Sequence, residues 1–351
     1  MWKQLKSVVL ISLASLALLG AIGYWYVQGF ALAESPKVDK QSSVSDLAFV
    51  RDGVRAPRGR ILAVLTSTAL IGTSGKKAGF ELTELSRAYY VFIANGYQVD
   101  IASPLGGKPP MNLDDGLVAA DYAFLNDPDA QQKLLNSAPL ARVEPADYAA
   151  VYFVGGKGTM FDFADNLDIQ RTVREVYERG GVIGAVCHGP AALLNVRLSD
   201  GRSLIAGKRI TGFTNAEELF LLKDARTLFP YLLQDRAIEQ GAQFIEGPLY
   251  LDNTIVDGRL ITGQNPWSTW SVAEAMVSAL GHKPVAREPT SEELSVGILH
   301  RYYRDGAAAA AEQANAQASR MDRRMLLMHA VVAAMQYRWR DTYHFQRLAR
   351  P

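Results

Sequence analysis

A strand–helix–strand pattern with tight connections occupies residues 60–102 and limits the folds open to this chain. Residues 60–66 form a short apolar run typical of a buried strand. Residues 81–95 place apolar side chains at helical spacing and end at Asn95-Gly96, a helix C-cap signal, and a second strand-like run at 97–102 follows at once. Strands joined in this way through a helix run parallel, so the pattern predicts a parallel sheet with helices on both faces.

The same alternation continues along the chain and extends the predicted sheet. We expect strands at 148–154, 182–186, 209–212 and 260–262, and helices at 166–179, 189–196 and 267–280. Residues 103–146 are rich in loop residues and are expected to form an inserted lid over one end of the sheet. The predicted fold class is therefore α/β, a flavodoxin-like parallel sheet sandwiched by helices.

Composition narrows the functions open to this fold. Apolar residues make up 48% of the 351 residues, which supplies a sizeable core. The 37 basic and 36 acidic residues leave a net charge of +1, so no overall field favours nucleic acid as a partner. Cys187 is the single cysteine of the chain, which excludes an intramolecular disulfide and any site built from several thiolates.

The sequence around Cys187 predicts that its thiol is reactive. In GGVIGAVCHGPAALL, residues 180–194, a buried strand delivers Cys187 into a turn before a helix, with small residues on either side. This is a cysteine version of the nucleophile elbow. The thiol should lie at the C-terminal edge of the sheet, where open α/β sheets bind ligands. The helix N-terminus is expected to lower the pKa of the thiol.

Several motifs in this order resemble a known family. They are AVCHGPAAL at 185–193, FVGGKGTMFDF at 153–163, ITGFTNAEE at 210–218 and LITGQNP at 260–266. They are similar to the DJ-1/PfpI superfamily of class I glutamine-amidotransferase-like proteins. The stretch KKAGFELTELSRAYYVFIANGYQVDIASPLGGKPP at 76–110 resembles its branch of stress chaperones and cofactor-independent glyoxalases of class III. The resemblance covers about residues 59–281.

The resemblance implies a role for each matching residue. Cys187 would be the nucleophile, His188 its proton-transfer neighbour, and Glu84 the carboxylate facing the sulfur. Oxyanion stabilisation or substrate binding would fall to Gly156, Lys157, Gly158 and Asn215, with backbone amides of Gly156 and His188 as oxyanion donors. No cofactor is implied.

Two of these positions depart from the family pattern. Lys157 stands where the family has histidine between two glycines, so a flexible cation replaces a ring. Where some relatives have an aspartate that orients the histidine, this chain offers Asn215, with Glu217 and Glu218 nearby. The other four histidines lie beyond the domain, so no two-histidine metal site is predicted; they are His282, His300, His329 and His344.

The N-terminal residues predict a membrane anchor. Residues 8–32 are uncharged and long enough to span a bilayer, and Lys3 and Lys6 precede them. This pattern predicts a single-pass inner-membrane protein whose domain lies on the periplasmic, extracytoplasmic side. The small-x-small sequence Ala31-Leu32-Ala33 leaves a cleaved signal peptide as the alternative. The predicted organisation is an anchor at 1–33, a linker at 34–58, the domain at 59–281 and a helical extension at 282–351.

The C-terminal extension carries no predicted chemistry. Its apolar stretch at 325–337 is too short to span a bilayer. We expect an amphipathic helix that packs on the domain or on a second copy of the chain in a homodimer, with the membrane surface as the alternative.

Three functions remain open at this point. The first is an enzyme in which the Cys187 thiolate adds to a small reactive carbonyl compound, with Glu84 and His188 moving protons. The second is a cysteine peptidase or amidohydrolase. The third is a chaperone or redox sensor without turnover.

Overall fold

The computed structural model describes residues 20–21, 23–34, 36–113 and 116–350. The described chain forms two compact units. One is Val38–Glu288, and the other joins the described residues up to Lys37 with those from Pro289 onward. Residues 38–58, expected to form most of a linker, belong to the first unit, where η2 (Val44–Asp46) and α2 (Ala48–Arg51) lie.

A seven-stranded sheet forms the centre of the first unit, in the order β10-β11-β7-β6-β1-β3-β5. Its strands are β1 (Arg60–Val64), β3 (Gln98–Ser103), β5 (Ala138–Pro139), β6 (Ala150–Phe153), β7 (Val182–Val186), β10 (Thr254–Asp257) and β11 (Leu260–Gly263). All neighbouring pairs are parallel except β10 with β11. The predicted α/β class with a parallel, flavodoxin-like sheet is confirmed.

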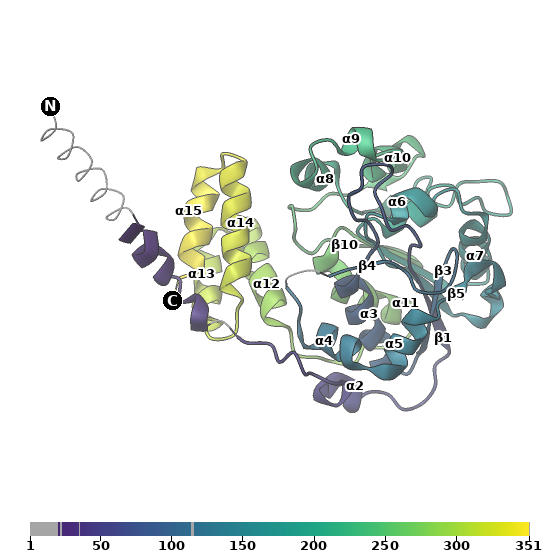
Figure 1. Ribbon diagram of the computed structural model, residues 1–351, viewed down its shortest axis with the longest axis horizontal. Helices are drawn as coiled ribbons and strands as arrows, with labels where there is room; N and C mark the ends of the chain where they lie inside the picture. The colour runs from purple at the N-terminus through teal and green to yellow at the C-terminus, as the bar shows by residue number, and fades with distance from the viewer. Residues whose placement is uncertain (1–19, 22, 35, 114–115, 351) are drawn as a thin grey trace, which may run out of the picture. The chain divides into compact units, whose positions relative to one another are not determined.

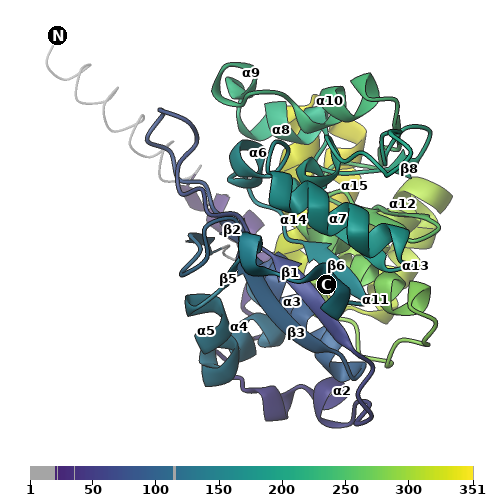
Figure 2. The ribbon, with the colours of Figure 1, turned by 90° about the vertical axis from the view of Figure 1, so that its right-hand side faces the viewer.

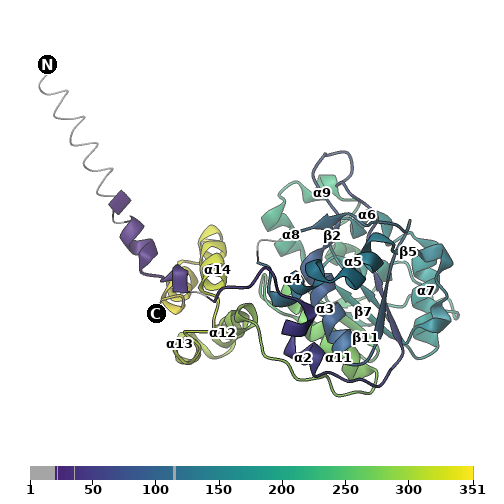
Figure 3. The same ribbon diagram turned by 60° about the horizontal axis from the view of Figure 1, so that its bottom comes forward.

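Helices cover both faces of this sheet, as its apolar central strands require. The long helices α3 (Leu82–Ala94) and α11 (Thr269–Ala279) pack against each other on one face. Figure 3 shows α3 and α11 next to each other, beside β7 and β11. On the other face, α7 (Leu167–Glu178) lies over the sheet (Figure 2). This helix and the 3-10 helix η5 (Gly189–Leu193) bury their apolar side chains against β6 and β7.

Shorter elements complete the unit. The helices are α4 (Ala119–Asn126), α5 (Pro128–Leu135), α6 (Thr159–Asp162), α8 (Asn215–Leu221), α9 (Ala225–Leu228) and α10 (Leu233–Glu239), with 3-10 turns η3 (Leu140–Arg142), η4 (Pro145–Asp147) and η6 (Pro266–Ser268). Two small parallel sheets pair β2 (Phe80–Glu81) with β4 (Met111–Asn112) and β8 (Arg209–Ile210) with β9 (Gln243–Phe244).

Three predicted elements differ in the structure. The helix expected over 189–196 is the five-residue η5, where Pro190 has no N–H to donate and the Ala191 N–H bonds the His188 carbonyl in the 3-10 manner. The strand expected at 209–212 is the short β8, which lies outside the main sheet. The segment 103–146, expected to form an inserted lid, instead contributes α4, which packs on α3, and the edge strand β5.

The structure corrects the expected membrane anchor. An α-helix needs about 20 residues to cross the bilayer core. Of the predicted span 8–32, only residues 20–21 and 23–28 are described as α-helical, and within the described part of the chain no helix has the length and apolarity to cross a membrane. Residues 1–19 and 22 lie outside the described residues. The transmembrane helix is therefore contradicted, and the inner-membrane, extracytoplasmic location that depended on it is not retained.

The second unit contains four C-terminal helices in place of the one amphipathic helix expected. They are α12 (Ser291–Asp305), α13 (Ala307–Ala316), α14 (Arg323–Met335) and α15 (Trp339–Leu348). The helices α14 and α15 run side by side, drawn in yellow in Figure 1. Leu299, Leu326 and Phe345 are buried in this unit, and the Tyr302 ring packs edge-on against Phe345. The described N-terminal residues, including η1 (Leu32–Glu34), belong to this unit, and the Tyr26 hydroxyl donates to Gln346 over 2.6 Å.

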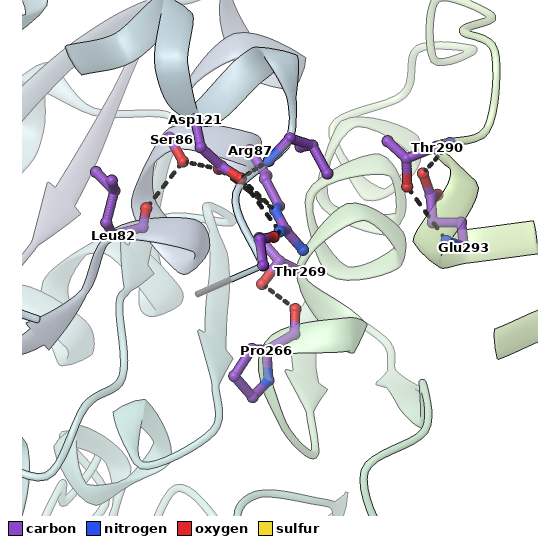
Figure 4. A network of polar contacts seen from close by, with 10 residues as sticks. Leu82, Ser86, Arg87, Asp121, Pro266, Thr269, Thr290 and Glu293 are labelled. Carbon is purple, nitrogen blue, oxygen red and sulfur yellow. Dashed lines mark hydrogen bonds and ion pairs between the residues drawn. The ribbon is translucent and has the colours of Figure 1, made fainter. Parts of the chain in front are cut away.

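A buried ion pair ties α3 to α4 in the first unit (Figure 4). The Arg87 guanidinium lies 3.1 Å from the Asp121 carboxylate, and their side chains are 2% and 0% exposed. The Ser86 hydroxyl contacts the same carboxylate over 2.5 Å and the Leu82 carbonyl over 2.9 Å. Because α3 also carries Glu84, this pair holds the helix that presents the predicted catalytic carboxylate.

Replacing Asp121 with alanine should destabilise the first unit strongly. The change removes the carboxylate that lies against the buried Arg87 charge, and breaking such an ion pair costs about 3–5 kcal/mol. Urea unfolding measures the loss. The matched control is Asp200→Ala, which breaks the exposed Arg202–Asp200 pair and should leave the unfolding midpoint unchanged. Equal midpoints for the two variants would contradict this account.

Candidate active site

Cys187 occupies a strained turn at the C-terminal end of β7. Its φ is 59°, in the left-handed region that residues other than glycine rarely adopt. Two backbone hydrogen bonds hold it there. The Cys187 N–H donates to the Gly263 carbonyl over 2.9 Å, and the Cys187 carbonyl accepts from the Phe213 N–H over 2.7 Å. The backbone therefore has the geometry expected of a nucleophile elbow.

His188 and Glu218 form a chain of polar contacts that starts at the Cys187 sulfur. The sulfur lies 3.3 Å from His188 Nδ1, and His188 Nε2 lies 2.5 Å from Glu218 Oε2. Both side chains are almost fully buried. A carboxylate at Nε2 favours the proton on that nitrogen, which leaves Nδ1 free to accept the thiol proton. The three groups have the order of a nucleophile, a base and a residue that orients the base.

Glu84 approaches the sulfur from the first turn of α3. Its side chain is fully buried and hydrogen-bonded to the Cys187 thiol. Its Oε2 also accepts the Gly155 N–H over 2.7 Å. A Cβ atom on Gly155 would lie only 2.6 Å from that oxygen and 2.8 Å from the Cys187 Cβ, so this position has no room for a side chain. The structure thus brings Cys187, His188 and Glu84 together.

The turn after β6 lies beside these groups. Gly156 has a φ of 106°, and a Cβ there would meet the Gly79 carbonyl at 2.2 Å, so only glycine fits. Gly158 donates its N–H to the same carbonyl over 3.3 Å. Within the described chain, the N–H groups of Gly156 and His188 have no hydrogen-bond acceptor. Lys157 is half-buried and forms no ion pair with a described residue.

The surroundings of Cys187 favour the thiol over the thiolate. Burial raises the pKa of the Cys187 thiol well above its usual range, and the carboxylates of Glu84 and Glu81 raise it further. The Lys157 charge acts in the opposite direction. The expected lowering of this pKa by a helix N-terminus is contradicted, since only the short η5 follows the cysteine. The residue as a whole is buried, with 3% of its surface exposed, and the polar side chains of His188 and Glu84 lie against its sulfur.

Asn215 does not reach His188. It is the first residue of α8, and its amide donates to Asp235 over 2.5 Å. Glu218, one helical turn further along, is the residue that contacts the histidine. The motif at 210–218 contains both residues, and positions three apart share a helix face, so helical spacing made Glu218 an equal candidate. The sequence offered Asn215 at the family position, with Glu217 and Glu218 nearby, and the structure places Glu218 against His188.

Fold and site together define a class of protein: a doubly wound α/β protein with a cysteine at the elbow, flanked by a histidine and a buried glutamate. Comparison with known families places the chain within this class. Residues 76–279 match the model of the DJ-1/PfpI family, and the chain belongs to that family.

Relatives in this family include proteins named as glyoxalases. The chain is 34% identical to glyoxalase 3 of Candida albicans, an alignment that covers 63% of this chain and 98% of that protein. It is also 34% identical to a glutathione-independent glyoxalase of Saccharomyces cerevisiae, covering 64% of this chain and 99% of that protein.

Solved structures give the same picture. The crystal structure of the C. albicans glyoxalase III superimposes with a TM-score of 0.57 at 31% identity, covering 63% of this chain and 97% of that one. A rapid encystment protein of Francisella tularensis gives a TM-score of 0.60 at 35% identity, covering 63% and 99%.

Titration of the single thiol tests the electrostatics of the site. Because burial and two carboxylates raise its pKa, Cys187 should be a thiol at pH 7 and ionise above the ordinary value of about 8.5. Ultraviolet thiolate absorbance against pH measures this directly. The Cys187→Ala variant is the blank, since it removes the only cysteine. A midpoint below pH 7 would show that the groups around the sulfur stabilise the anion instead.

Proposed function

We propose that this protein is a cofactor-independent glyoxalase that converts small 2-oxoaldehydes to 2-hydroxy acids. The observation that carries this proposal is the set of contacts around one sulfur: His188 Nδ1 at 3.3 Å and the buried Glu84 carboxyl on another side. Relatives aligned over nearly their whole length are named as glutathione-independent glyoxalases, which supports the same reaction.

The first step joins the sulfur to the aldehyde carbon. His188 Nδ1 takes the thiol proton, and the buried Glu218 carboxylate stabilises the imidazolium that results. The sulfur adds to the aldehyde carbon, and the aldehyde oxygen becomes an alkoxide that a proton neutralises to give a hemithioacetal. Because the free thiol has a raised pKa, it ionises together with substrate attack and not before it. The N–H groups of Gly156 and His188 would stabilise the alkoxide.

The second step moves a proton between two carbons. The hemithioacetal carbon loses its proton to a base, the neighbouring ketone carbon gains one, and the product is a 2-hydroxy thioester bound to Cys187. Glu84 is the base we assign, because its carboxyl contacts the sulfur that carries the substrate. Water then hydrolyses the thioester, which frees the thiol and releases the hydroxy acid. The sum is aldehyde plus water to acid, with no external oxidant or reductant.

A cysteine hydrolase is the second candidate, because the Cys187–His188–Glu218 order is also that of thiol hydrolases. The burial of Cys187 argues for small substrates. Because only 3% of the residue is exposed, a carbonyl compound of a few atoms can reach it more readily than an extended peptide. We therefore rank the aldehyde reaction first.

Replacing Cys187 with alanine should abolish turnover. A panel of methylglyoxal, peptides and amides, assayed without glutathione, distinguishes the two enzymatic functions. We expect hydroxy-acid formation from methylglyoxal by the wild type and none above the uncatalysed rate by Cys187→Ala. Cleavage of peptides or amides, with no acid formed from methylglyoxal, would replace the glyoxalase proposal with the hydrolase one.

Lys157 should ease ionisation of the thiol during catalysis. Its positive charge opposes the carboxylates around Cys187, so Lys157→Gln should raise the apparent pKa of the thiol and lower kcat/KM at pH 7. The control is Lys157→Arg, which keeps the charge and should keep the pKa near that of the wild type. The pH dependence of Cys187 alkylation by iodoacetamide measures the shift. An unchanged or lower pKa in Lys157→Gln would contradict this role.

A further inference from the structure

Two sequence motifs, at 210–218 and 260–266, meet at one buried carboxylate that the proposed chemistry does not use. This is Glu217, the residue before the histidine partner Glu218. Its side chain is fully buried, and both of its carboxylate oxygens accept hydrogen bonds. The motifs come from α8 and from the end of β11, which are separated by more than 40 residues in the chain.

Glu217 Oε1 accepts three hydrogen bonds from residues outside α8. The donors are the Tyr250 N–H at 2.7 Å, the Asn265 amide at 2.9 Å and the Gln264 amide at 3.0 Å. The Tyr250 hydroxyl also donates to the Glu217 carbonyl over 3.0 Å. These bonds fix the start of α8 against the end of β11 and the loop at Tyr250.

Glu217 Oε2 accepts two more bonds, from the N–H and the hydroxyl of Thr214, each at 3.1 Å. Thr214 is the N-cap of α8, and its hydroxyl in turn accepts the Glu217 N–H. This reciprocal pair is a capping box, which fixes the first turn of a helix.

The donors around Glu217 are fixed in orientation by further bonds. The Gln264 carbonyl oxygen accepts from the Gly247 N–H and from Asn253, so its NH2 group must face Glu217. The Asn265 carbonyl oxygen accepts from the Trp267 N–H, which turns that NH2 group the same way. A site lined only by donors suits a group that accepts at both oxygens, and an amide side chain fits it poorly.

We propose that Glu217 is a positioning residue, which holds Glu218 against His188 and ties that pair to the strand end that holds Cys187. The second tie is the Gly263 carbonyl, one residue before Gln264, which accepts the Cys187 N–H. The Glu217 carboxylate thereby fixes the position of Glu218, which orients His188, relative to the position of Cys187. The inference rests on the proposed function for its turnover readout, although the geometry it describes does not depend on the substrate.

A double-mutant cycle tests this role. Glu217→Gln should lower kcat by roughly tenfold or more with little change in KM, by analogy with the loss of an outer hydrogen-bond partner of a metal ligand. If Glu217 acts through Glu218, the same change should have almost no further effect in a Glu218→Gln background. Additive losses, equal in both backgrounds, would overturn the proposal and leave Glu217 a purely structural residue.

A milder variant covers the case in which Glu217→Gln fails to fold. Tyr250→Phe removes only the hydroxyl that bonds the Glu217 carbonyl and keeps the ring. It should give a smaller loss of kcat that likewise disappears in the Glu218→Gln background. A loss that persists there would count against the proposal.

A substrate-free readout separates this proposal from the glyoxalase assignment. The rate of Cys187 alkylation by iodoacetamide, measured across pH on the same variants, depends on His188 and Glu218 without any aldehyde. Suppose that the Glu217→Gln and Glu218→Gln effects on alkylation are coupled, but the wild-type protein turns over no aldehyde. This pair of results would reject the glyoxalase function and keep the role of Glu217. Additive effects on alkylation would reject that role whichever substrate is turned over.

Discussion

The left-handed backbone at Cys187 is the constraint on which the rest of the site depends. A residue with a side chain adopts φ near +59° only when its surroundings hold it there, at a cost of about 1–3 kcal/mol. Here the hydrogen bonds to Gly263, the last residue of β11, and from Phe213, which follows β8, hold it. The strain lifts the sulfur out of β7 and into contact with α3 on one side and His188 on the other. Without it, the Cys187 backbone would continue the extended conformation of β7.

Three buried glutamates lie in and around the site, and each has different contacts. Glu84 lies against the sulfur, Glu218 orients His188, and Glu217 accepts five hydrogen bonds from fixed donors. Burial of the thiol, together with the charges of Glu84 and Glu81, disfavours the thiolate, so the resting site holds the proton on sulfur. We therefore describe a nucleophile that is activated as it attacks, which limits its reaction with other electrophiles.

Much of this arrangement was predictable from local sequence. The strand that ends in Cys187, the helix that carries Glu84, and the turn at residues 155–158 follow from apolar periodicity and small residues in fixed order. The partner of His188 was not predictable in this way, because it depends on how α8 is set against Gln264 and Tyr250. The predicted lowering of the Cys187 pKa was also wrong, because burial of the thiol and its neighbours depends on the tertiary structure. Length and apolarity alone likewise suggested a membrane span that the described helices do not contain.

The central claim is that the Cys187 sulfur carries the substrate during turnover. The direct measurement is mass spectrometry of enzyme quenched in acid during steady-state reaction with methylglyoxal, followed by digestion. The account predicts a lactoyl group as a thioester on the peptide that contains Cys187, and on no other peptide. Steady lactate formation with that peptide unmodified, or with the acyl group on another residue, would contradict it.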